Sequence, residues 1–310
     1  MKAATQHQPP EGSGPRGIDF PSFVDSSARG AFADCPHKFF YQYLRHLHSL
    51  TPSIHLHAGG AFAKGMEVAR AHFYAKNNSA QVSIGEGMRA IILFYGDYMC
   101  PEDSAKSCEN ILQAFDYYFV QWGMETDTLK PYMNKGIPAV EFSFALPLPE
   151  CNHPVSGDPI LYTGRFDMLG QLSGGGIYVV DEKTTKSLGS TWPQQWDLRA
   201  QFTGYCWAAK EYGFEVEGAI IRGISILKRS NGHAQAITYR PQWKIDLWLE
   251  QLIRDVKSMI RMWEEGHWEQ NFDAACSLYG GCSYKPLCET HNPEQWIVGN
   301  YAKRVWDPLA

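Results

Sequence analysis

The chain has 310 residues, of which 44% are hydrophobic and 14% aromatic, enough for a large core. This composition excludes a chain that is disordered throughout. The formal net charge of −5 excludes a surface that is basic all over, so any nucleic acid must bind in a local basic groove.

The sequence contains no apolar run near the roughly 20 residues that span a bilayer. The N-terminus also lacks the charged-then-apolar order of a signal peptide. We therefore expect a soluble protein that does not associate with membranes. Its expected location is the cytoplasm of a bacterium, or that of the host if the chain is phage-encoded. Disulfides are rare in that compartment, so the eight cysteines need another explanation.

The first half of the chain is predicted to be mostly helical. Residues 1–20 are rich in Pro, Gly, Gln and Ser and are expected to form a disordered leader. Residues 21–130 are predicted to form a helical segment. Apolar residues recur at helical spacing in four stretches of it, near 35–47, 59–76, 84–99 and 104–123.

Residues 131–270 change in character and are predicted to form a core that contains a sheet. Three runs are strand-like, AVEFSFALPL (139–148), ILYTGRFDMLGQL (160–172) and GIYVVDEKTT (176–185). A helix over 192–211, a hairpin over 217–240 and a helix over 241–265 follow. This order predicts an α/β fold with a small mixed sheet flanked by helices, ending in a cysteine-rich segment over 271–310.

Acidic and basic residues gather at the end of the third strand. Asp181 and Lys183 are two residues apart, so their side chains share a face of the strand. Asp167 on the preceding strand shares that face if paired residue numbers sum to 348, which needs an odd loop such as Ser173 to Gly175. A two-residue Gly-Gly turn, with a sum of 349, would instead put the two carboxylates on opposite faces.

Two converging carboxylates and the backbone carbonyl of Glu182 would make a hard oxygen site for Mg²⁺ or Mn²⁺. Such an ion can activate water and neutralise a phosphate, while Lys183 stabilises developing negative charge. The alternative is a surface ion-pair cluster. The apolar run Ile177 to Val180 before these residues argues against it, because charges at the end of a central strand are costly without a role.

The motif GRFD, the strand ending in DEKT and the helix containing QFTGY together resemble the RecB-like branch of the PD-(D/E)XK nucleases. This resemblance implies a restriction-endonuclease-like core, with Asp167 and Asp181 as metal ligands and Lys183 as the catalytic lysine. It also assigns the family's Q-x-x-x-Y motif to Gln201 and Tyr205, one helical turn apart and therefore on one face.

The chain departs from this family at an early helix. The RecB-like pattern has Gly-x-x-x-His followed shortly by Glu, whereas GAFAKGMEVAR offers Gly60, Lys64 and Glu67. Lysine occupies the histidine position. Glu67 is still a candidate catalytic residue, as an outer ligand or a ligand of a second metal ion.

Three cysteines near the C-terminus, Cys276, Cys282 and Cys288, have the spacing C-x5-C-x5-C. Clusters of four thiolates bind zinc or an iron–sulfur cluster, and the absence of a tight C-x₂₋₄-C pair favours iron and sulfur over zinc without deciding between them. An ordinary loop without a metal is the alternative that the spacing leaves open. We expect the cysteines scattered elsewhere to pack as small apolar residues, namely Cys100, Cys108, Cys151 and Cys206.

The cysteine pattern resembles a subset of RecB-like nucleases that includes the AddB subunit, the CRISPR spacer-acquisition nucleases and phage-borne relatives. In these proteins one cysteine before the core and three after it hold a [4Fe–4S] cluster. The element CPHKFFYQYL supplies Cys35 as the early cysteine. The resemblance therefore implies a cluster on Cys35, Cys276, Cys282 and Cys288 that joins the N- and C-terminal segments.

Together these features predict a Mg²⁺- or Mn²⁺-dependent DNA exonuclease that acts in recombination, repair, or CRISPR-like or phage DNA processing. Its expected partner is DNA that is single-stranded or has free ends. Basic residues flank the proposed site in sequence and could contact phosphates, namely Arg165, Lys186, Arg199, Lys228 and Arg229. The alternatives are a non-catalytic DNA-binding subunit of a recombination complex, suggested by the missing histidine, and a nuclease stabilised by zinc.

Overall fold

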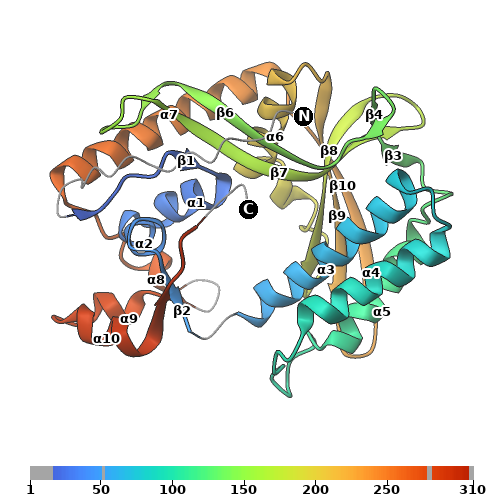
Figure 1. The fold of residues 1–310 in the computed structure, drawn as a ribbon, viewed down its shortest axis with the longest axis horizontal. Coiled ribbons are helices and arrows are strands. Elements are labelled where there is room, and N and C mark those ends of the chain that lie inside the picture. The colour runs from blue at the N-terminus through green and yellow to red at the C-terminus, as the bar shows by residue number, and fades with distance from the viewer. Residues whose placement is uncertain (1–16, 51–52, 278–280, 307–310) are drawn as a thin grey trace. The chain divides into compact units, whose positions relative to one another are not determined.

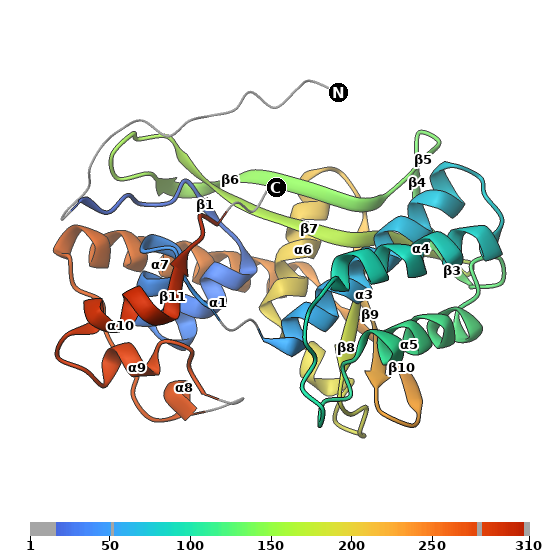
Figure 2. The same ribbon diagram turned by 60° about the horizontal axis from the view of Figure 1, so that its bottom comes forward.

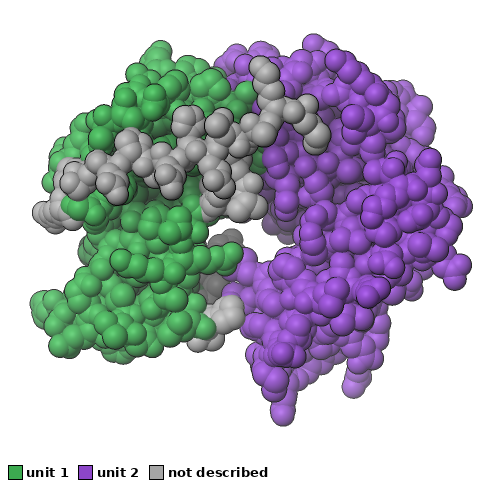
Figure 3. Space-filling model, in the orientation of Figure 1, with its two compact units in different colours: residues 1–51, 144–164, 247–310 green, residues 52–143, 165–246 purple. Residues whose placement is uncertain are grey.

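The structure is a computed structural model that describes residues 17–50, 53–277 and 281–306. The chain forms two compact units, coloured separately in Figure 3. Unit 1 contains residues 1–51, 144–164 and 247–310, and unit 2 contains residues 52–143 and 165–246. The units therefore differ from the four consecutive segments expected from the sequence, because each unit gathers stretches that are far apart in the chain.

Unit 2 contains a helical layer of three α-helices, α3 (Ile54–Arg70), α4 (Ala80–Tyr95) and α5 (Cys108–Gln121). A π-helical turn, η3 (Ala71–Ala75), extends α3. The hydroxyls of Ser79 and Ser107 accept hydrogen bonds from the amides of Val82 and Asn110, so both α4 and α5 begin at a capping serine. The three predicted helices are confirmed with shifted ends.

The helices of this layer pack closely on one another. Their buried side chains form one apolar cluster that includes Phe62, Met66, Ile91, Phe115 and Tyr118. Gly87 of α4 faces α3 and α5 at a point where a Cβ atom would lie 2.6 Å from the Phe115 ring. A glycine here allows the helices to approach more closely than any side chain would.

A mixed sheet lies beside these helices in unit 2. Its strands are β7 (Pro159–Leu172), β8 (Ile177–Thr185), β9 (Val216–Ile226) and β10 (Asn231–Tyr239), in that order (Figure 1). β8 is antiparallel to β7 and parallel to β9, and β9 is antiparallel to β10. The parallel step requires a crossover, which η4 (Gln194–Trp196) and α6 (Ala200–Glu211) provide.

Further strands complete the sheet and its surroundings. β3 (Leu129–Pro131) and β6 (Val140–Asn152) both pair with β7, while β4 (Met133–Asn134) and β5 (Ile137–Pro138) form a separate hairpin. β6 and β7 contribute residues to both units. The predicted α/β class, with a small mixed sheet flanked by helices, is confirmed.

The two faces of the sheet in unit 2 meet different helices. Ile224 and Ile226 of β9 pack into the apolar cluster of α3, α4 and α5. Gly223 points to the opposite face, where a Cβ atom would lie 2.4 Å from the Trp192 ring. Alternation along β8 and β9 therefore points successive side chains to opposite faces of the sheet. Figure 2 shows α3, α5 and α6 beside these two strands.

Unit 1 brings together the two ends of the described chain. Its N-terminal elements are β1 (Phe23–Val24), α1 (Ser26–Asp34), α2 (Pro36–Phe39), η2 (Phe40–Leu44) and β2 (Leu47–Ser49). After α7 (Gln242–Glu265) come α8 (Ala274–Ser277), α9 (Lys285–Cys288), α10 (Pro293–Asn300) and β11 (Tyr301–Lys303). β2 pairs antiparallel with β11, and the Tyr284 hydroxyl donates to the Leu47 carbonyl at 2.6 Å.

The predicted disordered leader needs a correction at its C-terminal end. Residues 1–16 of it lie outside the described part of the chain. Phe20 is buried against the Trp263 ring, and the Trp263 indole donates to the Ile18 carbonyl at 2.9 Å. The ordered chain therefore begins no later than Gly17.

No helix in the described residues combines the length and the apolar character that crossing a membrane requires.

Gly87 provides a test of the helical packing. We expect Gly87→Ala to lower the free energy of unfolding by about 1–3 kcal/mol, because its methyl group would overlap the Phe115 ring and the Gly65 carbonyl. Gly85→Ala on the same helix is the matched control, because a Cβ atom there meets nothing within 4 Å. That control should gain up to about 1 kcal/mol from helix propensity. Denaturant unfolding measures both, and equal effects of the two substitutions would contradict the described packing.

Candidate active site

The turn between β7 and β8 decides which side chains share a face. Met168 pairs with Val180 and Gly170 with Tyr178, so the paired numbers sum to 348. The Leu172 amide donates to the Gly176 carbonyl at 3.3 Å, which leaves a three-residue loop from Ser173 to Gly175. Gly175 has φ of 100°, a conformation that suits glycine. The odd loop predicted from the sequence is confirmed, and Asp167 falls opposite Asp181 in this register.

Asp167, Asp181 and Lys183 come together on this face. The Lys183 Nζ lies 2.5 Å from Asp181 Oδ2, and the Asp181 side chain is only 7% exposed. The Glu182 backbone amide donates to Asp167 Oδ2 at 3.1 Å. Lys183 Nζ also lies 5.7 Å from the centre of the Phe202 ring, so α6 covers this group of charges.

Negative charge outweighs positive charge at this place. Burial, followed by repulsion from Asp181 and Glu182, raises the pKa of Asp167 well above its usual value. Burial likewise raises the pKa of Asp181, although Lys183 opposes the shift. Burial acts to lower the pKa of Lys183, but attraction to Asp181 and Asp167 raises it overall. The group is therefore suited to accept a cation.

Glu141 is a third carboxylate near Asp167 that the sequence analysis missed. Its Oε2 lies 3.1 Å from Arg165 Nε, and its charge is one of those that raise the pKa of Asp167. Burial raises the pKa of Glu141 itself to about 7, with Arg165 and Arg70 acting in the opposite direction. It is the single charged residue in AVEFSFALPL, and that feature could have drawn attention to it.

Glu67, the acid expected from the early helix, makes a different contact. Its Oε1 lies 2.7 Å from Lys64 Nζ on the same helix, α3. Lys64, which stands where the resemblance to RecB-like nucleases predicted histidine, is therefore bound to the neighbouring acid. Glu67 is close enough to contribute to the raised pKa of Glu141. Its role as a metal ligand stays a prediction.

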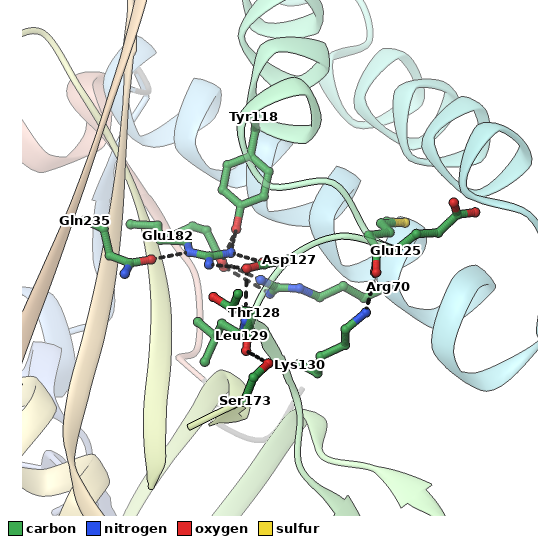
Figure 4. A network of polar contacts seen from close by, with 12 residues as sticks. Arg70, Tyr118, Glu125, Asp127, Thr128, Leu129, Lys130, Ser173, Glu182 and Gln235 are labelled. Carbon is green, nitrogen blue, oxygen red and sulfur yellow. Dashed lines mark hydrogen bonds and ion pairs between the residues drawn. The ribbon is translucent and has the colours of Figure 1, made fainter. Parts of the chain in front are cut away.

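The side chain of Glu182 points away from Asp181 and Lys183. Its carboxylate accepts two hydrogen bonds from Arg70 and one from the Tyr118 hydroxyl at 2.9 Å (Figure 4). Burial acts to raise the pKa of Glu182, but Arg70 and Tyr118 lower it below its usual value. The expected orientation is confirmed, and only the Glu182 backbone lies on the side of the other acids.

Gln201 and Tyr205 share one face of α6, as their spacing predicts. The Gln201 Nε2 donates to the Tyr205 hydroxyl at 3.1 Å. The Tyr205 ring packs edge-on against Phe166, the neighbour of Asp167, with 5.5 Å between ring centres. The pair therefore lies next to the strand that carries Asp167.

Four cysteines of unit 1 line a common cavity, namely Cys35, Cys276, Cys282 and Cys288. Cys35 follows α1, and its sulfur accepts a hydrogen bond from the Asn271 amide at 3.5 Å. Burial raises the pKa of the Cys288 thiol, and the charges of Cys282, Cys35 and Cys276 add to the effect. These are the four cysteines that the sequence pattern selected.

The remaining cysteines lie elsewhere. Cys151 and Cys206 are buried, while Cys100 and Cys108 pack against the apolar cluster of unit 2.

Within residues 17–50, 53–277 and 281–306, no group of three or more His, Cys, Asp or Glu side chains is arranged to hold a metal ion.

Comparison with known proteins matches one family model, and the solved structures that resemble this chain include the two that follow. The sequence model described as "PD-(D/E)XK nuclease superfamily" matches residues 27–289. The crystal structure of a candidate exonuclease from Eubacterium rectale is 12% identical over 82% of this chain and 87% of its own, with a TM-score of 0.47. The crystal structure of SSO0001 is 12% identical over 73% and 84%, with a TM-score of 0.32. A search of the curated proteins found no match.

The family match spans the helices of unit 2, strands β7, β8, β9 and β10 of the mixed sheet, and all four of Cys35, Cys276, Cys282 and Cys288. It agrees with the restriction-endonuclease-like core expected from the sequence. The chain belongs to the PD-(D/E)XK nuclease superfamily.

Proposed function

We propose that this protein is a Mg²⁺- or Mn²⁺-dependent exonuclease that hydrolyses phosphodiester bonds of DNA. The observation that carries the proposal is the convergence of Asp167, Asp181 and Lys183 on one face of the β7–β8 hairpin. The preference for DNA ends rests on the sequence resemblance. Single strands and duplexes with free ends are both suitable substrates for the proposed activity.

The donor atoms fit a hard divalent cation. Asp167 and Asp181 would bind it through carboxylate oxygens, with the Glu182 carbonyl as a further donor. Burial, followed by repulsion from Asp181 and Glu182, raises the pKa of Asp167, and a cation beside this carboxylate would favour its charged form. Closing the site requires the side chains to turn toward one point. When bound, such an ion lowers the pKa of a water molecule and neutralises charge on the phosphate.

Protein groups perform the remaining work. Lys183, held by Asp181 at 2.5 Å, is placed to stabilise negative charge that develops on the phosphate oxygens. Arg165 is exposed and lies beside Glu141, so it can exchange that partner for a DNA phosphate. α6 covers the lysine with Phe202 and excludes water from one side of it.

Removing the lysine or one acid tests the activity. We expect Lys183→Ala and Asp181→Asn each to reduce the cleavage rate by about 10²–10³-fold, because each removes charge stabilisation in the transition state. DNA labelled at the 5′ or 3′ end, single- or double-stranded, measures rate and direction with each metal ion. Lys210→Ala, a lysine on α6 that binds Gln242, is the control and should keep full activity. Wild-type rates in both site variants would overturn the proposal.

Glu141 and Glu67 are the two candidates for a further carboxylate that supports metal binding beside Asp167 and Asp181. We expect Glu141→Gln to raise the Mg²⁺ concentration for half-maximal activity by about 10–100-fold, because its charge acts directly on Asp167. Glu67→Gln should have a smaller effect, since Lys64 already neutralises that carboxylate. Mg²⁺ titrations of the activity of the two variants distinguish these candidates. A larger increase in the half-maximal Mg²⁺ concentration for Glu67→Gln than for Glu141→Gln would show that Glu67 is the ligand.

We further propose that Cys35, Cys276, Cys282 and Cys288 hold a [4Fe–4S] cluster. Four thiols lining one cavity supply the donor set that such a cluster needs, although zinc would accept the same ligands. The cluster would fix the segment after α1 to the segment around α8 and α9. Its role would be structural, because metal binding at such a site adds to the free energy of folding.

Metal content tests the cysteine site. We expect anaerobically purified protein to be brown and to contain iron, and Cys276→Ser or Cys35→Ser to lose both colour and iron. Cys100→Ser, outside the cavity, is the matched control and should keep them. Metal analysis with visible absorbance makes the measurement. Zinc in place of iron would support the zinc-stabilised nuclease, and unchanged iron in Cys276→Ser would refute the assignment.

A non-catalytic DNA-binding role is the second candidate. The observation that favours it is Lys64, which stands where the family has histidine and binds Glu67 instead of leaving it available. Binding of labelled DNA without cleavage under Mg²⁺ and Mn²⁺ would select this function over the exonuclease.

A further inference from the structure

Figure 4 shows a buried network of charges around the side chain of Glu182. Because side chains alternate along β8, this network lies on the opposite face of the strand from Asp181 and Lys183. Its members are two arginines and two acids, paired as Arg70 with Glu182 and Arg222 with Asp127. All four side chains are at most 9% exposed. The Tyr118 hydroxyl joins the pairs, because it donates to Glu182 Oε1 at 2.9 Å and accepts from Arg222 Nη1 at 3.4 Å.

Stability alone does not account for this network. Four charges have been removed from water, and well-packed apolar side chains of similar size usually serve a core at least as well as a buried ion pair. What an ion pair adds is a fixed geometry. Both arginines hold their acids with two hydrogen bonds, since Arg222 binds Asp127 at 2.5 and 2.8 Å. Arg70 likewise donates two hydrogen bonds to the Glu182 carboxylate, of which the one from Nη1 is 3.0 Å long.

Glu182 connects this network to the candidate active site. It stands between Asp181 and Lys183 in the sequence, and its own amide donates to Asp167 Oδ2 at 3.1 Å. A displacement of the Glu182 peptide would move that hydrogen bond and both neighbouring side chains together. The position of Asp167 relative to Asp181 therefore depends on how firmly the Glu182 carboxylate is held.

We propose that Arg70 is a positioning residue for the cation site, acting through its two-pronged contact with Glu182. The inference rests on the proposed function, since it concerns the acids assigned to the metal ion. Arg70 belongs to α3, the helix that carries Lys64 and Glu67. The contact thus also fixes that helix to the strand bearing the acids.

The planar guanidinium is what the geometry requires. Two of its N–H groups fix both the distance and the orientation of a carboxylate, whereas a lysine amine provides only a point charge. Arg70→Lys should therefore keep the charge balance of the core and lose the orientation of Glu182. Arg222→Lys is the matched control, because it makes the same change in the same network, at a pair whose acid, Asp127, lies outside β8.

The experiment compares Arg70→Lys, Arg222→Lys and wild type by Mn²⁺ binding in calorimetry, by DNA cleavage and by thermal unfolding in chelator. We expect Arg70→Lys to weaken Mn²⁺ binding by about 10–100-fold, with the KM for DNA unchanged. Arg222→Lys should lose thermal stability to a similar extent and bind Mn²⁺ within about twofold of wild type. Equal Mn²⁺ affinity of Arg70→Lys and wild type, or equal weakening in both variants, would overturn the inference.

A second pair of variants covers the case in which a single change unfolds the protein. Arg70→Gln leaves the Glu182 carboxylate buried without its counter-charge, and Glu182→Gln added to it removes that charge. The double variant should recover stability relative to Arg70→Gln but not Mn²⁺ affinity, because the two-pronged contact is still missing. Recovery of both to wild-type levels would overturn a positioning role.

Calorimetry separates this inference from the proposed function. If wild type binds Mn²⁺ and cleaves no DNA, the exonuclease assignment fails while the binding constants of the variants still decide the role of Arg70. A wild-type protein that binds no Mn²⁺ would overturn both the cation site and the positioning role.

Discussion

The register of β7 against β8 is the constraint on which the candidate active site depends. A loop of three residues, with Gly175 at a positive φ, makes paired residue numbers sum to an even value. A loop shorter by one residue would turn Asp167 to the other face of the sheet. The carboxylates would then be separated by the thickness of a strand, and no choice of side-chain rotamers could bring them together around one ion.

Alternation along β8 also explains why its charges are neutralised so differently. Glu182 faces α3 and α5, where Arg70 and Tyr118 satisfy its oxygens, and the second pair in that network is balanced as well. Asp167 and Asp181 face the other way and share Lys183. On the face with Glu182, acidic and basic side chains are paired one to one. On the face with Asp181, two carboxylates share one lysine, so negative charge is in excess. That asymmetry is the physical basis for assigning the cation to the face with Asp181.

The cysteines present a separate problem of geometry, within unit 1. β2 and β11 pair, and Tyr284 binds the Leu47 carbonyl, so protein contacts already bring the segment after Cys35 near the C-terminal segment. The apolar cluster of Tyr41, Tyr284 and Tyr301 lies at the same place. An iron–sulfur cluster on the four thiols would strengthen the arrangement that these contacts define, which is consistent with a structural role for it.

The sequence by itself determined the element types, the shared face of Asp181 and Lys183, the spacing of Gln201 and Tyr205, and a choice between two loop lengths. These properties depend on residues close together in the chain, because side-chain direction repeats with a fixed period in strands and helices. Only the tertiary structure decided between the loops, placed Glu141 near Asp167, paired Glu182 with Arg70 112 residues away, and gathered distant segments into two units. Those contacts depend on which surfaces pack together. The local periodicity of the sequence does not determine which residue will pair with a buried charge.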